Sequence, residues 1–333
     1  MSEANPVAQL GRHAAGSMVS IAICTLTNAN VPELLGEAPE SAGTLAEKAG
    51  INPDALRRLL RVLAGYGIFR EESPGRFAHT AQSRVLRADH PRSLRGLFRM
   101  ITFDAKLLEL LPETLRSGRP ASALLAPGGI FEYLATHPEE ARIFDEGMTS
   151  KAHGDVAWLL GTYDFSKFST IADIGGGRGH LIRAILAAAP SARGILFDLP
   201  QVTGATSQSD RLTIQAGDFF RDRLPACDAY LLMNVIHDWP DAEASKIFKA
   251  VRQAAPSHAK LLLIEVLLPE KSELGELGAF SPVILDARML YWTGGRERTL
   301  SQYENLLGQA GFSVSRVIPS DEHLSVMECI PRG

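Results

Sequence analysis

A histidine and an aspartate stand side by side in NVIHDWPD, residues 234–241, directly after the apolar run AYLLM. The run predicts a buried strand, so His237 lies where that strand ends. An imidazole has an ordinary pKa of about 6.5 and can accept a proton from a substrate hydroxyl near neutral pH. A single histidine in such a place is more often only a polar residue that marks the end of a strand. Its role therefore depends on the groups around it.

A glycine-rich stretch, ADIGGGRGHLIRAIL at residues 172–186, leads from a second predicted strand into a predicted helix. Glycines such as Gly175, Gly176 and Gly177 let the backbone come close to a ligand, and the N-terminus of the following helix favours negative charge. A dinucleotide site, a methyltransferase cofactor loop and a tight turn without a ligand all fit such a cluster.

Acidic residues near the ends of the neighbouring strands narrow this choice. Asp198 follows the loop by about twenty residues, where a carboxylate can accept both hydroxyls of a ribose. Asp218 and Phe219 follow a third strand and could meet the amine and the ring of an adenine. Asp173 precedes the glycines and could lie near the ammonium group of a methionine tail. This last carboxylate favours S-adenosyl-L-methionine over NAD.

The elements that must position these residues follow two patterns. From residue 40 to about 165 the apolar spacing is helical, with one interruption. A helix that begins at Thr44 as N-cap and ends at Gly50, a second helix over 52–67 and a hairpin around SPG give the order of a winged-helix module. Beyond residue 165, short β-rich runs alternate with helices, which predicts a parallel sheet covered on both faces. The segment FSVSRVIPSDEHLSVMEC predicts an antiparallel edge hairpin.

The winged-helix order permits two interpretations of Arg57, Arg58 and Arg61 on the second helix. The helix could enter the major groove of DNA, as in a repressor. It could instead belong to a dimerisation platform whose arginines face solvent. The formal net charge of −4 favours the platform, because nucleic-acid-binding proteins are usually basic.

Several motifs together resemble a known family: ADIGGGRGHL, ILFDLPQV, GDFF, NVIHDWPD, IEVLLPE and TGGRERTLSQYENLLGQAGF, in this order. They are similar to the S-adenosylmethionine-dependent small-molecule O-methyltransferases of the plant caffeate and bacterial polyketide-tailoring type. The resemblance covers roughly residues 40–330. It implies an α/β fold, a doubly wound class I methyltransferase sheet with an antiparallel C-terminal hairpin, after a mostly helical winged-helix domain that forms a homodimer. The expected boundaries are 1–100 for the winged-helix dimerisation domain, 101–165 for a helical region that contributes to the acceptor pocket, and 166–333 for the catalytic domain that binds S-adenosylmethionine.

The resemblance also implies roles for individual residues. It gives His237 the role of general base and places Glu265 and Glu297 beside it, where either carboxylate could orient the imidazole. Asp238 would lie at the rim of the substrate site. The implied contacts to the cofactor are Asp173, Gly175, Gly176, Gly177, Asp198, Leu199, Gly217, Asp218, Phe219 and Asn234, although relatives often carry lysine or arginine in place of Asn234.

The acceptor pocket is expected to include Phe144, Met148, Met289 and Trp292, for which burial in the core is an equal alternative. The predicted reaction transfers a methyl group to a hydroxyl of a small aromatic or polyketide-like secondary metabolite by in-line displacement. Methylation of nitrogen or carbon, a DNA-binding regulator that senses the cofactor, and an NAD-dependent oxidoreductase remain as alternatives.

The composition of the 333 residues sets broader limits. Three scattered cysteines predict reduced thiols, and no apolar run approaches the roughly 20 residues that span a bilayer. With no secretion signal recognised, a cytoplasmic protein that binds neither nucleic acid nor membrane is expected. The sequence shows no compact Asp/Glu/His ligand set, so no divalent metal is expected.

Overall fold

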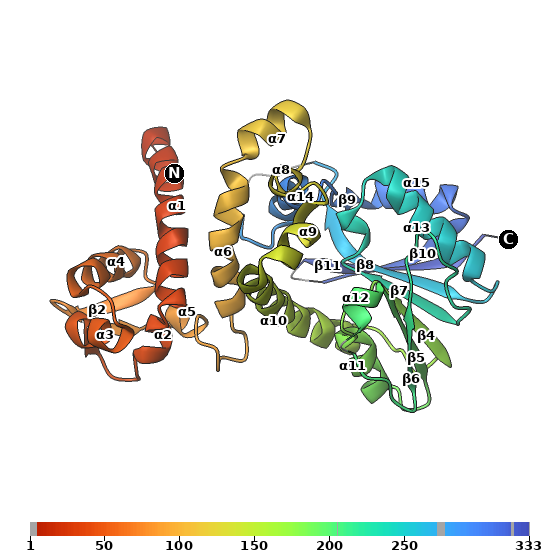
Figure 1. Ribbon diagram of the computed structural model, residues 1–333, viewed down its shortest axis with the longest axis horizontal. Helices are drawn as coiled ribbons and strands as arrows, with labels where there is room; N and C mark the ends of the chain where they lie inside the picture. The colour runs from red at the N-terminus through yellow and green to blue at the C-terminus, as the bar shows by residue number, and fades with distance from the viewer. Residues whose placement is uncertain (1–4, 205, 272–276, 321–322, 333) are drawn as a thin grey trace. The chain divides into compact units, whose positions relative to one another are not determined.

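The computed structural model describes residues 5–204, 206–271, 277–320 and 323–332, without the side chains of 149–153. The chain forms two compact units (Figure 1). Residues 1–109 and 134–154 make up the first unit, and residues 110–133 and 155–333 make up the second. Helices α9 (Gly129–Thr136) and α10 (Pro138–Thr162) run from one unit into the other. The division expected at residues 100 and 165 stays a prediction.

The first unit combines helices with a small sheet of order β1-β3-β2. Its other elements are α1 (Pro6–Asn28), α2 (Val31–Leu34), β1 (Glu40–Ser41), α3 (Ala42–Ala49), α4 (Pro53–Gly65), β2 (Phe69–Ser73), β3 (Arg76–His79), α5 (Ala81–Arg84) and α6 (Arg95–Leu108). The predicted order of helix, helix and hairpin is confirmed. The predicted N-cap is wrong by three residues, because the Ser41 hydroxyl accepts the N–H of Thr44 and α3 therefore begins earlier.

The arginines of α4 are paired with acidic side chains. Arg57 lies 2.9 Å and Arg58 lies 3.9 Å from carboxylate oxygens of Asp54. Arg61 lies 3.4 Å from Glu71 on β2. These pairs offset the positive charge that contact with a DNA backbone would need.

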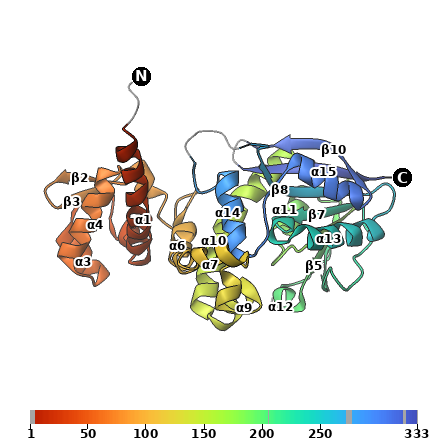
Figure 2. The same ribbon diagram turned by 90° about the horizontal axis from the view of Figure 1, so that it is seen from above.

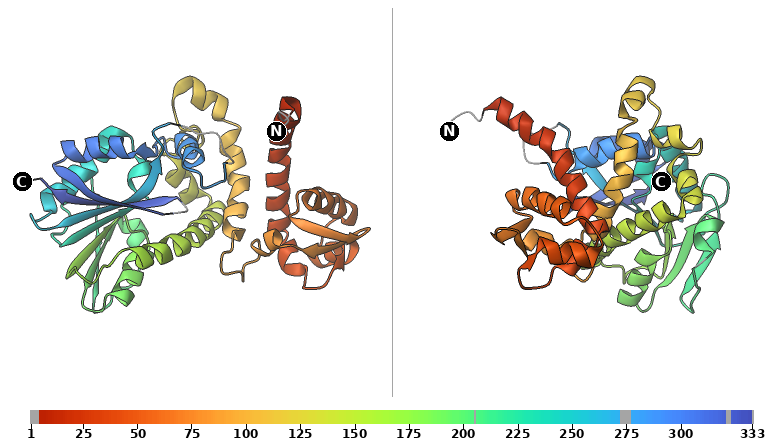
Figure 3. Two further views of the ribbon diagram at one scale, coloured as in Figure 1. Left: turned by 180° about the vertical axis from the view of Figure 1, so that it is seen from behind. Right: turned by 60° about the vertical axis from the view of Figure 1, so that its left-hand side comes forward.

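The second unit is built on one large sheet with the strand order β10-β11-β8-β7-β4-β5-β6. Strands β4 to β8 are parallel along this path, and the hairpin of β10 and β11, blue in Figure 3, is antiparallel at one edge. The strands are β4 (Thr170–Ile174), β5 (Arg193–Asp198), β6 (Leu212–Ala216), β7 (Ala229–Met233), β8 (Lys260–Leu268), β9 (Arg298–Thr299), which pairs with β8, β10 (Phe312–Pro319) and β11 (Leu324–Pro331). The predicted sheet and its edge hairpin are confirmed.

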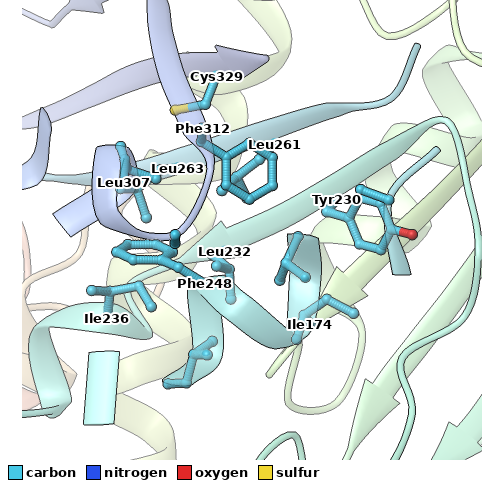
Figure 4. Packing of buried hydrophobic residues seen from close by; sticks show 14 of the residues in the cluster. Ile174, Tyr230, Leu232, Ile236, Phe248, Leu261, Leu263, Leu307, Phe312 and Cys329 are labelled. Atoms are coloured by element: carbon cyan, nitrogen blue, oxygen red, sulfur yellow. The ribbon is translucent and has the colours of Figure 1, made fainter. Parts of the chain in front are cut away.

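Helices cover both faces of this sheet, because successive strand residues point to opposite sides. On one face, Tyr230, Leu232, Leu261 and Leu263 pack with residues of α13 and α15 (Figures 2 and 4). On the other face, the intervening residues pack with α10, α11 and α14. The remaining helical segments are α7 (Leu111–Ser117), α8 (Ser122–Leu125), α11 (His180–Ala188), α12 (Pro200–Thr203), the short turn η1 (Ile236–Asp238), α13 (Asp241–Ala254), α14 (Pro282–Trp292) and α15 (Leu300–Gln309).

The order in which the parallel strands are added reverses at β4, whose neighbours are β5 on one side and β7 on the other. In such sheets ligands bind beyond the carboxyl ends of the strands at this point. The glycine loop follows β4, Asp198 is the last residue of β5, and His237 lies four residues beyond the end of β7. Within the described ranges, we find no helix long and apolar enough to cross a bilayer.

Candidate active site

The glycine loop after β4 takes a path that side chains would obstruct. Gly175, Gly177 and Gly179 have φ angles of +70°, +61° and +79°, in the left-handed region that favours glycine. A Cβ on Gly175 would lie 3.0 Å from Val235, and one on Gly176 would lie 2.5 Å from the carboxyl group of Asp173. Glycine is therefore required at Gly175 and Gly176 for the loop to pack against Val235 and Asp173.

Asp198 is fixed by this loop. Its Oδ2 accepts the N–H of Gly177 at 2.8 Å, and its Oδ1 accepts the N–H of Leu199 at 2.7 Å. Burial raises the pKa of Asp198, and the two backbone N–H groups oppose that rise. Each carboxylate oxygen has a second lone pair, so the group can still accept two ligand hydroxyls. The arrangement fits the predicted ribose contact.

Asp173 is a buried carboxyl group with a vacant acceptor. It is 2% exposed, and its Oδ2 receives no hydrogen bond from the described residues. Burial raises its pKa to about 7. An isolated carboxylate is costly to bury, so a cationic group of a ligand would stabilise its charged form. This property fits the predicted contact to the ammonium group of S-adenosylmethionine.

The other predicted cofactor residues lie beyond β5, β6 and β7. The N–H of Gly217 donates to the carbonyl of Asp198, which joins the ends of β5 and β6. The half-buried Asp218 accepts the N–H of Phe220 at 2.9 Å. The ring of Phe219 packs edge-on against Trp239, with centroids 5.9 Å apart.

Two further predicted cofactor residues differ in backbone and exposure. Leu199 is exposed at the start of α12. Asn234 directly follows β7 and has a φ of +52°, which is uncommon for a residue other than glycine. It is one place beyond the strand and three places before His237.

His237 lies on η1 between two buried glutamates. Its Nδ1 lies 3.0 Å from Oε1 of Glu297 and 3.4 Å from Oε2 of Glu265. Because a carboxylate can only accept, Nδ1 carries the hydrogen and donates it to Glu297. Its Nε2 lies 3.9 Å from the carboxylate of Asp238. The fold thus brings together all three predicted catalytic residues, with Asp238 next to them.

The two glutamates hold different parts of this site. Oε1 of Glu265 accepts the N–H groups of Val235 and Ile236, at 3.0 and 2.7 Å. Glu265 therefore fixes the backbone that carries the histidine, while Glu297 holds the imidazole itself. The sequence left open which carboxylate orients the ring, and the hydrogen bond identifies Glu297.

Burial lowers the pKa of His237, whereas the negative charges of Glu265 and Glu297 raise it. The effect of the two charges is larger, so the net shift of the pKa is upward. Burial also raises the pKa of Glu265, which the imidazole partly opposes. His237 and Glu265 together therefore hold a proton more tightly than a free histidine does. A proton accepted by this imidazole from a substrate would be stabilised in the same way.

The three side chains also form a compact ligand set. One donor atom from each of His237, Glu265 and Glu297 lies within 4.8 Å of the others. The expectation that the chain has no such set is wrong, because the fold assembles it from three separate segments. Nδ1 of His237 and one oxygen of each glutamate take part in the hydrogen bonds given above, whereas Oε2 of Glu265 and Oε2 of Glu297 accept none from the described residues. The absence of a metal stays a prediction.

Two residues that support the site were missed in the sequence. Asp286 on α14 accepts the backbone N–H of Glu297 at 3.0 Å. Gly295 lies so close to the turn that a Cβ there would overlap the carbonyl group of His237. A charged residue inside the apolar run VILDARMLYW was the available signal for Asp286, whereas a single glycine in GGRERT gives no sign of close packing.

The residues predicted for the acceptor pocket lie on two helices. Phe144 and Met148 are on α10 in the first unit, where Phe144 is half-buried and Met148 is exposed. Met289 and Trp292 are on α14 in the second unit and are buried. The Trp292 carbonyl accepts the hydroxyl of Ser122. Their contact with an acceptor stays a prediction.

Family models and curated relatives match almost the whole chain. Residues 111–313 match the O-methyltransferase domain, and residues 12–89 match the O-methyltransferase dimerisation domain. The chain is 34% identical to a phenazine O-methyltransferase of Lysobacter antibioticus, over 95% of this chain and 94% of that protein. It is 35% identical to an 8-amino-8-demethylriboflavin N,N-dimethyltransferase of Streptomyces davaonensis, over 93% of this chain and 91% of that protein.

One similar solved structure contains a bound cofactor. Human N-acetylserotonin methyltransferase in complex with S-adenosylmethionine is similar to the chain with a TM-score of 0.87 and 25% identity, over 100% of this chain and 99% of that one. The glycine loop, the vacant oxygen of Asp173 and the fixed carboxylate of Asp198 fit the same cofactor. The chain belongs to the O-methyltransferase family and is an S-adenosylmethionine-dependent O-methyltransferase with an N-terminal dimerisation domain.

Proposed function

We propose that this enzyme methylates a phenolic hydroxyl of a small aromatic or polyketide-like secondary metabolite, with His237 as the general base. The observation that carries the proposal is the hydrogen bond from Nδ1 of His237 to Glu297. In the neutral imidazole this bond places the hydrogen on Nδ1 and leaves the lone pair of Nε2 to accept a proton. The proposed acceptor hydroxyl donates to Nε2.

The cofactor contacts follow from the chemistry of the carboxylates. We assign the ammonium group to Asp173, the ribose hydroxyls to Asp198 and the adenine to Asp218 and Phe219, with Gly175, Gly176 and Gly177 beneath the ligand. Leu199, Gly217 and Asn234 complete this proposed site. When bound, S-adenosylmethionine supplies a methyl group that is activated by a sulfonium charge.

The charges around His237 suit a phenol in particular. A phenol has a pKa of about 10, well above that of an ordinary imidazolium at about 6.5. The two carboxylates raise the pKa of His237 towards that of the phenol, which lowers the cost of the proton transfer. Glu297 keeps the ring in place while the imidazolium forms, and Asp238 would contact the acceptor at the rim.

The acceptor atom is open to a second proposal, because the riboflavin-type relative is an N,N-dimethyltransferase at 35% identity. An aromatic amine would also lose a proton during methylation, and His237 could accept it. The alternative of a DNA-binding regulator gains no support, because Arg57, Arg58 and Arg61 are paired with acids and residues 12–89 match a dimerisation domain.

We also propose that Met289 and Trp292 line the acceptor site in the second unit, since thioethers and aromatic rings adapt to flat ligands. The expected roles of Phe144 and Met148, on α10 in the first unit, stay predictions. A cytoplasmic location is proposed from the three cysteines, which are buried free thiols.

The experiment uses methyl-labelled S-adenosylmethionine with pairs of matched phenols and anilines on bicyclic and tricyclic rings. We expect labelled methyl ethers from the phenols and little transfer to the anilines. Preferential labelling of the anilines would replace the oxygen acceptor by nitrogen. Dialysis against EDTA should leave the rate unchanged, and a loss that added zinc or magnesium restores would contradict the proposed metal-free mechanism.

A further inference from the structure

Arg298 is a buried arginine that the proposed mechanism does not use. It is 0% exposed and lies on β9, one residue after Glu297. A buried guanidinium needs acceptors for all its N–H groups, and its burial is a poor way to gain stability. Its contacts therefore indicate what the charge is for.

All five N–H groups of Arg298 have acceptors. The Nε and Nη2 groups donate to Oδ1 of Asp241, at 3.0 and 2.8 Å. The Nη1 group donates to the carbonyls of Ile236 and Arg296, at 3.2 and 3.4 Å. The second hydrogen of Nη2 goes to the carbonyl of Trp239, at 2.7 Å.

These carbonyls stand on both sides of His237 in the sequence. Ile236 is the residue before the histidine, and Trp239 lies two residues after it. The carbonyl of His237 accepts the N–H of Arg296 at 2.8 Å, and Glu265 accepts the two N–H groups at the start of the turn. The turn at 235–239 is thus fixed through its N–H groups by Glu265 and through its carbonyls by the strand that carries Arg298.

This geometry connects the turn that carries His237 to the segment that carries Glu297. A single 3₁₀ turn has weak internal hydrogen bonds and does not hold a side chain firmly by itself. The rigid fork of Arg298 connects that turn to the start of β9, directly after Glu297. A lysine could not replace it, because an ammonium has three donors and no planar fork.

We propose that Arg298, with Asp241, is a positioning residue for methyl transfer: it fixes the distance between the imidazole of His237 and the carboxylate of Glu297. This inference depends on the proposed role of His237 as the base. Arg298 acts through the turn at 235–239 and not through contact with either substrate.

The test compares Arg298→Lys, Arg298→Met and Asp241→Asn with the wild-type enzyme, each at saturating concentrations of S-adenosylmethionine and acceptor. We expect kcat to fall by about 10²-fold in the Arg298 variants and by less in Asp241→Asn, since a displacement of about 1 Å near a reacting group has that effect. Both KM values should stay within about threefold of the wild-type values, because no substrate contact is lost.

The pH profile separates positioning from a structural role. Arg298→Lys keeps the positive charge, so its effect on the pKa of His237 comes from a looser contact with Glu297, which lowers that pKa. The ascending limb of kcat against pH should therefore move to lower pH in Arg298→Lys. The control is Phe168→Ala, which removes a buried ring on the other face of the sheet and lowers the melting temperature without touching the turn. It should keep the wild-type kcat and the wild-type limb.

Several outcomes would overturn the inference. One is a folded Arg298→Lys variant with the wild-type kcat and the wild-type ascending limb of kcat against pH. Another is a loss of kcat that is fully explained by the fraction of unfolded protein. If the Arg298 variants do not fold, an unchanged kcat and limb in Asp241→Asn decides against it. In a His237→Ala background, Arg298→Lys should add almost nothing, and an additive loss contradicts action through the histidine. Wild-type turnover of His237→Ala alone would instead refute the proposed base.

Discussion

At the scale of single residues, the site divides one task between two carboxylates. Glu297 bonds to the imidazole, whereas Glu265 bonds to the backbone beneath it. Both contribute negative charge to His237, but only Glu297 determines which ring nitrogen carries the hydrogen. Substitutions that keep the shape of each side chain can therefore separate charge from orientation.

Replacing Glu297 by glutamine should reduce kcat by about 10²-fold or more, a typical loss when a positioned base is disabled. The amide could donate to Nδ1 and favour the wrong tautomer. In Glu265→Gln an oxygen remains to accept the two backbone N–H groups, so we expect a smaller loss. Its ascending kcat–pH limb should move to lower pH, because one negative charge beside His237 is gone. Equal kcat losses in the two variants would contradict the division of roles.

Asp173 gives a second prediction, in the stability of the free enzyme. Its pKa is raised from an ordinary 3.8 to about 7, so the folded state binds a proton more tightly than the unfolded state does. The stability from this group is fully present below about pH 4 and is lost as pH rises through 7. Asp173→Asn cannot ionise and should therefore gain in melting temperature relative to wild type between pH 5 and 8.

The same variant should bind S-adenosylhomocysteine about 10-fold or more weakly, because the ammonium loses its carboxylate. Melting curves at several pH values and calorimetric titration measure the two effects. A melting-temperature difference that is constant with pH would show that Asp173 does not titrate as expected.

At the scale of elements, the sequence predicted the sheet well because its signals are local. The strands from β4 to β8 are short β-rich runs, most of them separated by helices, and β10 and β11 are two β-rich runs in close succession. The N-cap of α3 was misplaced because Ser41 and Thr44 are both good capping residues, and only the packing of α3 decides between them. Strand β9 was missed because two residues carry no periodicity.

The site was predicted less completely than the sheet. The resemblance named His237, Glu265 and Glu297, but hydrogen bonds were needed to separate the two glutamates. Asp286 and Gly295 act through the backbone, on an N–H and a carbonyl. Such contacts depend on how segments that are distant in the sequence pack together, and they cannot be predicted from residue type.

The packing of the loop before β9 against the turn gives a test at this scale. A Cβ in Gly295→Ala would overlap the carbonyl of His237 and push the turn away from Glu297. We expect kcat to fall by about 10²-fold, from a displacement of about 1 Å. Gly161→Ala, on α10, is the matched control, since a Cβ there meets nothing within 4 Å. An unchanged kcat in Gly295→Ala would mean that the turn can move without consequence.

At the scale of the whole molecule, the dimerisation domain at 12–89 contains most of α1. Within the domain this helix exposes apolar side chains on one face, among them Met18 at 57% and Ile21 at 39%. Apolar residues that recur along one face of a helix and stay exposed are typical of a protein interface. We expect the enzyme to be a homodimer that uses this face.

The double substitution Met18→Asp and Ile21→Asp should convert the dimer into a monomer, because two charges would be buried without partners in each contact. Light scattering after size exclusion measures the mass. Leu115→Asp is the control, since Leu115 is 84% exposed but lies outside the dimerisation domain. A double variant that stays dimeric at micromolar concentration would place the interface elsewhere.

The central claim, that His237 is the base, is tested most directly by the pH dependence of kcat in His237→Ala and in wild type, with both substrates saturating. Wild-type kcat should rise with pH along a limb whose midpoint lies above the ordinary histidine value of about 6.5, because the carboxylates raise the pKa of His237. In His237→Ala, kcat should be about 10² to 10⁴ times lower and the limb should disappear, while binding of S-adenosylhomocysteine stays unchanged. A variant with wild-type kcat, or with the same limb, would contradict the claim.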